Sequence, residues 1–372
     1  MYDIPDCTLI TSYLILDERI DLADCHANGE PIITSNGEPI ITTNSFFSLP
    51  CYLVIFCTKE TISALKKKRS AFNLLSMTMF IEIELKDMWT YQYLNQIRTN
   101  RFIYYPTGNF ETEENPHLIN CNKFDFMLQV MNINPFKTSK FGWVNCFFVK
   151  KDNYICERYT FNDMLYVLRN ITDKFHIQVL NVCDKKYKLQ ENKHEYYNQF
   201  RYIVCGGFFT CSDKVGRPIL NRLKDIFVQT TNAGYGHGEE MLFLEVLDEF
   251  KDDINKSYGD YAQLLNNFIR PIINFHYIYY FVLHNYVNYG YFDEAYECAK
   301  VLISVIDSYE SDVCSVIHMK ILFDYYLSVR NANPDEVQSV VNYIQKKCAN
   351  NPQMKKEFEK NQNCYGFPAL KN

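Results

Sequence analysis

The stretch that decides the fold is Cys51-Tyr52-Leu53-Val54-Ile55-Phe56-Cys57, followed directly by Thr58-Lys59-Glu60. Its seven apolar residues, several of them β-branched or aromatic, have the length of a strand that is buried on both faces. The residues from Thr58 onward open an amphipathic pattern that continues to Arg69 and predicts a helix. A buried strand that passes at once into a helix is typical of sheets whose strands run parallel.

The same alternation extends to both sides of this stretch. Thr8–Leu16 (TLITSYLIL) predicts a preceding buried strand, Met77–Ile83 a third strand, and Lys86–Arg98 another helix. We therefore expect an α/β fold, with a mixed, mostly parallel sheet flanked by helices. Ligands of such sheets bind beyond the carboxyl ends of the strands.

The middle of the chain continues the pattern as far as Asp260. The elements expected there are helices at His117–Asn132 and His237–Phe250 and strands at Phe141–Val149 and Tyr202–Thr210. Gly206 and Gly207 interrupt the second of these strands. Glycine inside a strand marks either a bulge or a close approach of ligand or backbone.

From Tyr261 onward the apolar spacing is helical. Tyr277–Tyr289, Tyr296–Ile306 and Cys314–Val329 each predict a helix, and Asn333 is the expected cap of one more. The sequence thus predicts an α/β domain at 1–260 and a helical C-terminal region at 261–372.

A duplication lies between the first two strands. Asn28-Gly29-Glu30-Pro31-Ile32-Ile33-Thr34 recurs as Asn36-Gly37-Glu38-Pro39-Ile40-Ile41-Thr42. Gly-Glu-Pro is turn chemistry, so a hairpin-like or mobile loop is expected. Two copies are too few for a solenoid.

Composition excludes several classes of protein. A net charge of −6 over 372 residues argues against a nucleic-acid binder, which would carry a basic field. The 29 Tyr and 28 Phe, with many Asn, Ile and Lys, suggest an AT-rich genome such as that of a large DNA virus or an intracellular parasite.

Features of targeting and redox chemistry favour a cytoplasmic location, which would be the host cytoplasm for a viral protein. The amino terminus has no basic region followed by an apolar run, so no secretory signal is expected. The apolar stretch Phe268–Phe281 is too short and polar to span a membrane. The 14 cysteines are scattered without a Cys-x-x-Cys pair, which favours free thiols over disulfides or zinc.

Several motifs with known chemistry are absent from the sequence. There is no phosphate loop, dinucleotide fingerprint, His-Glu-x-x-His or Gly-x-Ser-x-Gly elbow. Kinases, Rossmann dehydrogenases, zincins and α/β-hydrolases are therefore disfavoured.

Four segments, in this order, resemble the WlaTC/HtrL family of glycosyltransferases. They are Thr8–Leu14 (TLITSYL), Asn134–Asn145 (NPFKTSKFGWVN), Cys205–Phe209 (CGGFF) and Gly236–Leu242 (GHGEEML), the last followed by Ser257–Tyr261 (SYGDY). Leu49-Pro50 and Lys123 also stand where that family has them. The match spans roughly residues 8–265 and rests on order and spacing rather than on any single motif.

The resemblance implies a GT-A-like fold and transfer of a hexosyl or related sugar from a nucleotide-sugar to a glycan or protein acceptor. Such enzymes usually hold Mn²⁺ or Mg²⁺ with acidic side chains at a strand end. Here Asn145 stands where the family has an aspartate, so a metal bound by Asn145 and His237, a metal on another acid such as Asp184, and metal independence all remain open.

The remaining candidate residues follow from where each segment lies. Glu239 and Glu240 open a helix, where the dipole favours carboxylates, and one of them is the candidate base for the acceptor hydroxyl. The candidate donor-binding residues are Thr11, Ser12, Arg69, Lys123, Asn145, Gly206 and Gly207. Trp143 is expected in the core.

An alternative function follows from Asn145. A chain that lacks the family's acid is also consistent with a catalytically inactive GT-A-like module that binds a glycan or a protein.

Overall fold

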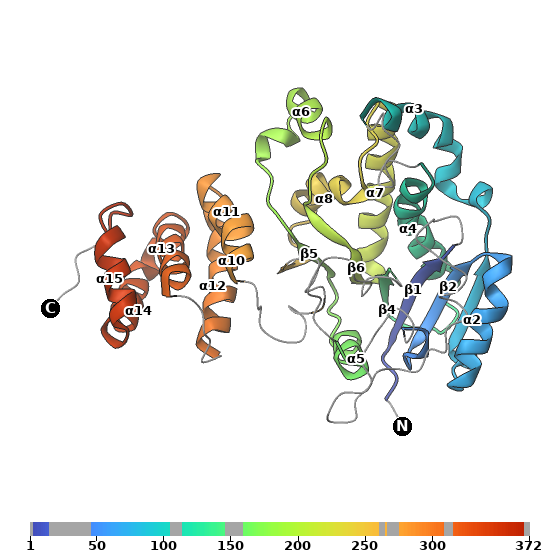
Figure 1. The fold of residues 1–372 in the computed structure, drawn as a ribbon, viewed down its shortest axis with the longest axis horizontal. Coiled ribbons are helices and arrows are strands. Elements are labelled where there is room, and N and C mark those ends of the chain that lie inside the picture. The colour runs from blue at the N-terminus through green and yellow to red at the C-terminus, as the bar shows by residue number, and fades with distance from the viewer. Residues whose placement is uncertain are drawn as a thin grey trace. The chain divides into compact units, whose positions relative to one another are not determined.

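The computed structural model describes residues 3–14, 46–104, 114–145, 159–259, 265, 275–308 and 315–367. The duplicated Gly-Glu-Pro segment lies outside the described residues. The chain forms two compact units (Figure 1). The first is an α/β unit made of 1–178, 185–257 and 261–269, and the second is a helical unit made of 270–372 with the short pieces 179–184 and 258–260.

A seven-stranded sheet has the order β3-β2-β1-β4-β6-β5-β7. Its strands are β1 (Cys7–Tyr13), β2 (Tyr52–Cys57), β3 (Thr78–Glu82), β4 (Lys140–Val144), β5 (Phe175–Val179), β6 (Val204–Ser212) and β7 (Ile254–Tyr258). β1 pairs in parallel with β2 and β4, β2 pairs in parallel with β3, and β6 runs antiparallel to β4. The expected α/β class, with a mixed and mostly parallel sheet flanked by helices, is confirmed.

The helices of the α/β unit are α2 (Lys59–Ala71), α3 (Leu94–Tyr104), α4 (Glu114–Ile133), α5 (Phe161–Arg169), α6 (Lys193–Tyr197), α7 (Asp213–Asn232) and α8 (Phe243–Glu249). α4 is buried along most of its length and packs against β1, β4 and α7. A Cβ on Gly216 of α7 would lie only 2.5 Å from the sulfur of Cys211 in β6. Glycine at this position is therefore what lets α7 lie so close to the sheet.

Two helices expected from the sequence begin with tighter turns. The segment expected to be helical from Lys86 is two 3₁₀ turns, Leu85–Asp87 and Trp89–Tyr93, followed by α3. The segment expected to be helical from His237 is a 3₁₀ turn, Glu239–Leu242, followed by α8. β5, β7, α5 and α7 had no counterpart among the sequence-based expectations.

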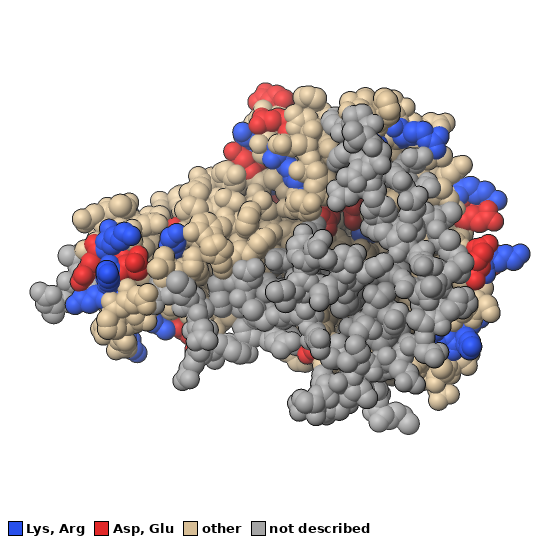
Figure 2. Space-filling model, in the orientation of Figure 1, with Lys and Arg blue, Asp and Glu red and all other residues tan. Residues whose placement is uncertain are grey.

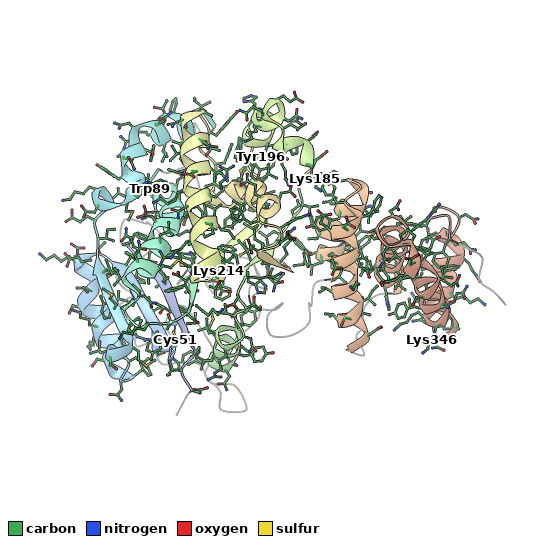
Figure 3. All side chains as sticks on the ribbon, turned by 180° about the vertical axis from the view of Figure 1, so that it is seen from behind. Cys51, Trp89, Lys185, Tyr196, Lys214 and Lys346 are labelled. Atoms are coloured by element: carbon green, nitrogen blue, oxygen red, sulfur yellow. The ribbon has the colours of Figure 1, made fainter. Side chains whose placement is uncertain are left out.

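Arg69 is a structural residue, because its guanidinium is hydrogen-bonded within the fold and is not available to bind a phosphate. The residue is fully buried, and its guanidinium donates to the carbonyls of Phe47, Leu49 and Cys51 and to the Thr78 hydroxyl. Four of the five N–H groups of an arginine are thereby used. Figure 3 labels Cys51, at the start of β2. The expectation that Arg69 contacts the donor is corrected accordingly.

The helical unit contains α10 (Phe275–Ile278), a π-helical segment (Tyr279–Leu283), α11 (His284–Asn288), α12 (Phe292–Ser308), α13 (Ser315–Ala332), α14 (Val337–Asn350) and α15 (Pro352–Asn361). Buried side chains of the π-helical segment and of α12, α13, α14 and α15 form most of its core. Ile278 of α10 and Tyr286 of α11 also contribute to it. Asn333 has the expected N-cap position, before the 3₁₀ turn Pro334–Glu336 that leads into α14, although its side chain makes no cap hydrogen bond. The Asn351 side chain caps α15. The expected boundary at residue 260 precedes the helical unit's main segment by ten residues.

Two expectations on targeting and redox chemistry can be compared with the described residues. None of the helices described is long and apolar enough to cross a membrane. The ten cysteines in the described ranges are free thiols, and nine of these are buried or half-buried.

Candidate functional site

The carboxyl end of β4 and the amino end of β6 lie side by side because the two strands are antiparallel. The backbone amide of Asn145, the residue after β4, donates to the Gly207 carbonyl at 2.8 Å. The sheet order reverses between β1 and β4, and α/β sheets bind ligands at such reversal points. Thr11 and Ser12, near the carboxyl end of β1, approach the same edge; Thr11 is fully buried and Ser12 half-buried.

Lys123 of α4 is the central cation of this edge. Its side chain is fully buried, and its ammonium donates to the Gly206 carbonyl at 3.0 Å and to Glu239 Oε1 at 2.8 Å. The ammonium also lies 5.7 Å from the centre of the Trp143 ring. A buried charge is tolerated only when it is paired and hydrogen-bonded, and Lys123 meets both conditions.

Glu240 holds the other side of the same glycine. Its Oε1 accepts the Gly206 amide at 2.8 Å, so the two polar backbone atoms of Gly206 are bound by this glutamate and by Lys123. A Cβ at Gly206 would lie 3.0 Å from Glu239 Oε1 and 3.4 Å from Lys123 Nζ. Glycine is thus required by close packing of the charged side chains and not by an unusual backbone angle.

Trp143 and Asn145 complete the edge. Trp143 is 2% exposed, which confirms its expected place in the core. Its indole N–H donates to Asn145 Oδ1 at 2.7 Å, so the orientation of the amide is fixed. Asn145 itself is half-buried, and its side-chain oxygen keeps one further lone pair.

His237 lies in the turn before Glu239 and lines a small cavity. Burial and the charge of Arg101 lower the pKa of His237 to about 4, although a hydrogen bond to the Asn198 backbone opposes them. The histidine is therefore neutral at pH 7. The cavity, about 10 Å³, has room for about one water and is also lined by His117, Cys121 and Tyr197.

The candidate metal ligands do not form a recognisable ligand set. Asn145 is engaged by Trp143, whereas His237 faces the cavity wall. Within the described ranges no three His, Cys, Asp or Glu side chains are grouped as metal ligands. Asp184 belongs to the helical unit, where it accepts a hydrogen bond from Tyr291. These residues do not fit a Mn²⁺ or Mg²⁺ centre.

Three side chains that were not expected from the sequence bind backbone carbonyls in and beside the glycine-rich turn, residues 234–238. Asn100 donates to the carbonyls of Thr231 and Tyr235, and Arg101 donates to that of Gly236 at 2.6 Å. The hydroxyl of Tyr196, labelled in Figure 3, donates to the Met241 carbonyl at 2.9 Å. No local pattern marks these residues in the sequence, because each acts on a segment far along the chain.

The charged side chains on the face shown in Figure 2 are intermingled. Lys and Arg lie beside Asp and Glu and form no continuous basic field on the described surface visible there.

Comparison with known proteins finds similarity in structure but not in sequence. No protein-family model matches the chain, and no curated protein sequence matches it. Among solved structures, the chain is similar to mouse xyloside xylosyltransferase 1 in its apo form, with 10% sequence identity and a TM-score of 0.35. The match covers 67% of this chain and 84% of the mouse chain. At this level the similarity carries no argument about what this chain does.

Proposed function

We propose that this chain is a glycosyltransferase of the WlaTC/HtrL kind that moves a sugar from a nucleotide-sugar to a hydroxyl of a glycan or protein acceptor. The observation that carries the proposal is the convergence of Lys123, Gly206, Glu239 and Glu240 beside the end of β4. Gly206 and the two glutamates come from two of the four segments in which the sequence resembles that family, and Lys123 also stands where the family has it.

The reaction assigns distinct tasks to the two glutamates. The acceptor oxygen attacks the anomeric carbon, the bond from that carbon to the nucleotide diphosphate breaks, and the acceptor proton passes to a carboxylate. We assign the proton to Glu239, whose side chain is 11% exposed and whose orientation is fixed by the Lys123 ammonium. Glu240 is a positioning residue, since it anchors the backbone of Gly206.

Lys123 also acts as a positioning residue. Because its ammonium is fully buried and bound by Glu239 and Gly206, it supports the base instead of reaching for the donor phosphates. Thr11, Ser12, Asn145 and Gly207 are the candidate contacts to the donor, from the ends of β1, β4 and β6. Charge on the leaving diphosphate then has to be met by groups other than Lys123.

The test is a panel of UDP-, GDP- and CMP-sugars assayed for donor hydrolysis and for thermal shift, with and without Mn²⁺. We expect one nucleotide class to raise the melting temperature and its sugar to be hydrolysed. Glu239→Gln should abolish hydrolysis or transfer while leaving nucleotide binding in place. No turnover together with no nucleotide-induced shift across the panel would sink the proposal.

A second candidate function is a catalytically inactive module that binds a glycan or a protein. The neutral Asn145, held by Trp143 at the position of the family's acid, favours it. The same panel separates the two functions: glycan or nucleotide binding without turnover, unchanged by Glu239→Gln, would favour the binding module.

A further inference from the structure

The helical unit contains a π-helical segment, Tyr279–Leu283, between two ordinary helical turns. In an α-helix a residue five positions onward lies about 140° around the axis, on a different face. The wider π turn, with its i→i+5 hydrogen bonds, brings such residues into line. Here the Tyr279 hydroxyl lies 3.3 Å from Nδ1 of His284, five residues later.

Both side chains meet one buried carboxylate on α13. Nδ1 of His284 lies 3.0 Å from Oδ2 of Asp324, which is 1% exposed. Asp324 Oδ1 is buried and has no hydrogen-bond partner among the described residues. A buried carboxylate of this kind depends strongly on its counter-charge. The His284 side chain is 35% exposed, so it can exchange its proton with solvent.

The charges around His284 come from two directions. The hydrogen bond to Asp324 and its charge raise the pKa of His284, against burial and the charge of Lys320. The Lys320 ammonium donates to the Tyr280 hydroxyl at 2.7 Å and lies 5.9 Å from the centre of the Tyr279 ring. Of the other titratable groups on packed elements, Tyr365 is influenced by Asp324, whereas Glu294 of α12 acts on Tyr258 and Tyr286 and Glu297 of α12 acts on Tyr258. α12 and α13 also carry Asp293, Lys300, Asp307, His318, Tyr325, Tyr326 and Arg330.

We propose that Tyr279, His284 and Asp324 form a proton-controlled latch that holds the π-helical register of residues 279–283. With His284 protonated, the carboxylate is neutralised and both π-aligned side chains are tied to α13. When His284 loses its proton, Asp324 loses its counter-charge. The interaction that favours the alignment of positions 279 and 284 then becomes weaker. The segment then relaxes toward ordinary α-helical hydrogen bonding.

The direction with pH follows from the raised pKa of His284. A histidine whose pKa is raised by folding stabilises the folded state fully below its ordinary value, 6.5, and this stabilisation is lost as the pH rises through the raised value. The latch is therefore closed under mildly acidic conditions and opens on the alkaline side.

The experiment uses the full chain with ¹³C-labelled histidine rings and follows it by NMR while the pH is raised from below 6.5 to the alkaline side. Hydrogen exchange of peptides that cover residues 275–288 is measured by mass spectrometry at the same pH values. Loss of one signal in His284→Gln assigns that ring. We expect a midpoint above 6.5 for His284 and faster amide exchange of 275–288, beyond the intrinsic pH effect, through the same midpoint. A midpoint at or below 6.5, or exchange that does not follow the midpoint, would overturn the latch.

Three variants keep the test independent of any folding defect. Asp324→Asn should lower the His284 midpoint and abolish the pH-linked exchange, whereas Tyr279→Phe, which keeps the ring, should weaken the link and leave the midpoint raised. His318→Gln is the matched control, since His318 is also buried on α13 but lies outside the triad. An effect of His318→Gln equal to that of Asp324→Asn would contradict the proposal.

Discussion

Two ion pairs, one in each unit, show how differently the fold uses a buried carboxyl group. Lys123–Glu239 in the α/β unit joins a fully buried ammonium to a carboxylate whose side chain is 11% exposed. His284–Asp324 in the helical unit has the opposite distribution, with the cation 35% exposed and the carboxylate 1% exposed. In the first pair the fully buried partner is the lysine. In the second the exposed partner is a histidine, whose charge responds to solvent.

The difference indicates what each pair is suited for. The first pair lies against Gly206, whose carbonyl accepts from Lys123 and whose amide donates to Glu240, and such a fixed geometry suits the proposed catalytic role. The second pair adjoins the π-helical segment, and its histidine is partly exposed to solvent, which favours a switch.

Removing the cation of the first pair should have the largest effect. Lys123→Met leaves the Glu239 carboxylate buried without its partner and should cost about 3–5 kcal/mol of unfolding free energy. Activity in the proposed reaction should be lost at temperatures where the variant is still folded. Urea unfolding followed by tryptophan fluorescence measures the cost.

Lys224→Met is the matched control for that variant. Lys224 also pairs with a carboxylate, Asp125, and lies over the Trp89 ring, but its side chain is 19% exposed and its partner is not one of the two glutamates of the site. We expect a smaller loss of stability and unchanged activity. Equal losses for the two variants would show that the Lys123 pair has no special place.

Gly206→Ala should have the next largest effect, and it tests whether the first pair is rigid. The new methyl group would lie 3.0 Å from Glu239 Oε1 and 3.3 Å from Glu240 Cγ. Overpacking of this kind costs about 1–3 kcal/mol, and displacement of Glu239 should lower the rate far more than the stability.

Gly142→Ala provides an almost identical steric control. Its added methyl would lie 3.0 Å from Leu9 Cδ2 and 3.3 Å from Thr210 Cγ2, inside the sheet and away from the glutamates. We expect a comparable shift in melting temperature with the rate retained in the folded fraction. A rate loss as large as that of Gly206→Ala would mean that general sheet distortion, not the site, explains the effect.

The response of stability to pH should separate His284 from the buried histidines of both units. Burial lowers the pKa values of His176, His237 and His318 to about 4, and each therefore stabilises the fold above its ordinary pKa of 6.5 and loses that contribution as the pH falls. His284 has the opposite sign, with its contribution lost as the pH rises. The melting temperature of His284→Gln should therefore fall below that of the unaltered chain on the acidic side and converge with it on the alkaline side. A difference independent of pH would contradict this assignment.

The strands that build the site could be predicted, but its contacts could not. β1, β2, β3, β4 and β6 were each expected from continuous apolar runs, and all five are confirmed. β7 (Ile254-Asn255-Lys256-Ser257-Tyr258) has polar residues on both faces of the pattern and gives no such run. Long apolar runs reveal strands that are buried on both faces. Polar residues interrupt the run in β7, at one edge of the sheet, and also in β5 (FHIQV), which lies between β6 and β7.

The contacts of the site depend on residues that are far apart in the chain. Lys123, Gly206 and Glu239 were named as separate candidates. In the sequence Lys123 is 83 residues from Gly206 and 116 residues from Glu239, and the packing of α4 on the sheet brings them together. Arg69 shows the reverse case. It was named as a candidate contact to the donor, whereas its guanidinium donates to three carbonyl groups of residues 47–51.

The π-helical segment lay beyond prediction for a related reason. Apolar spacing of three and four across Tyr277–Tyr289 predicts a continuous α-helix. The extra residue in the turn is held by contacts with Asp324, 40 residues after His284, which no local pattern encodes.

The smallest effect is expected from Asn145→Asp, which restores the acid of the resembling family. The Trp143 indole N–H can donate to a carboxylate as well as to an amide, so the free energy of unfolding should change by about 0.5 kcal/mol or less. The melting temperature should therefore change little. Because no three acidic, histidine or cysteine side chains are grouped as metal ligands among the described residues, one more acid should not create Mn²⁺-dependent turnover. Isothermal titration with Mn²⁺ alone and the donor assay with Mn²⁺ or a chelator measure both outcomes. Tight Mn²⁺ binding by the variant would show that a metal centre is one carboxylate from completion, and the first ion pair would then belong to a metal-dependent site.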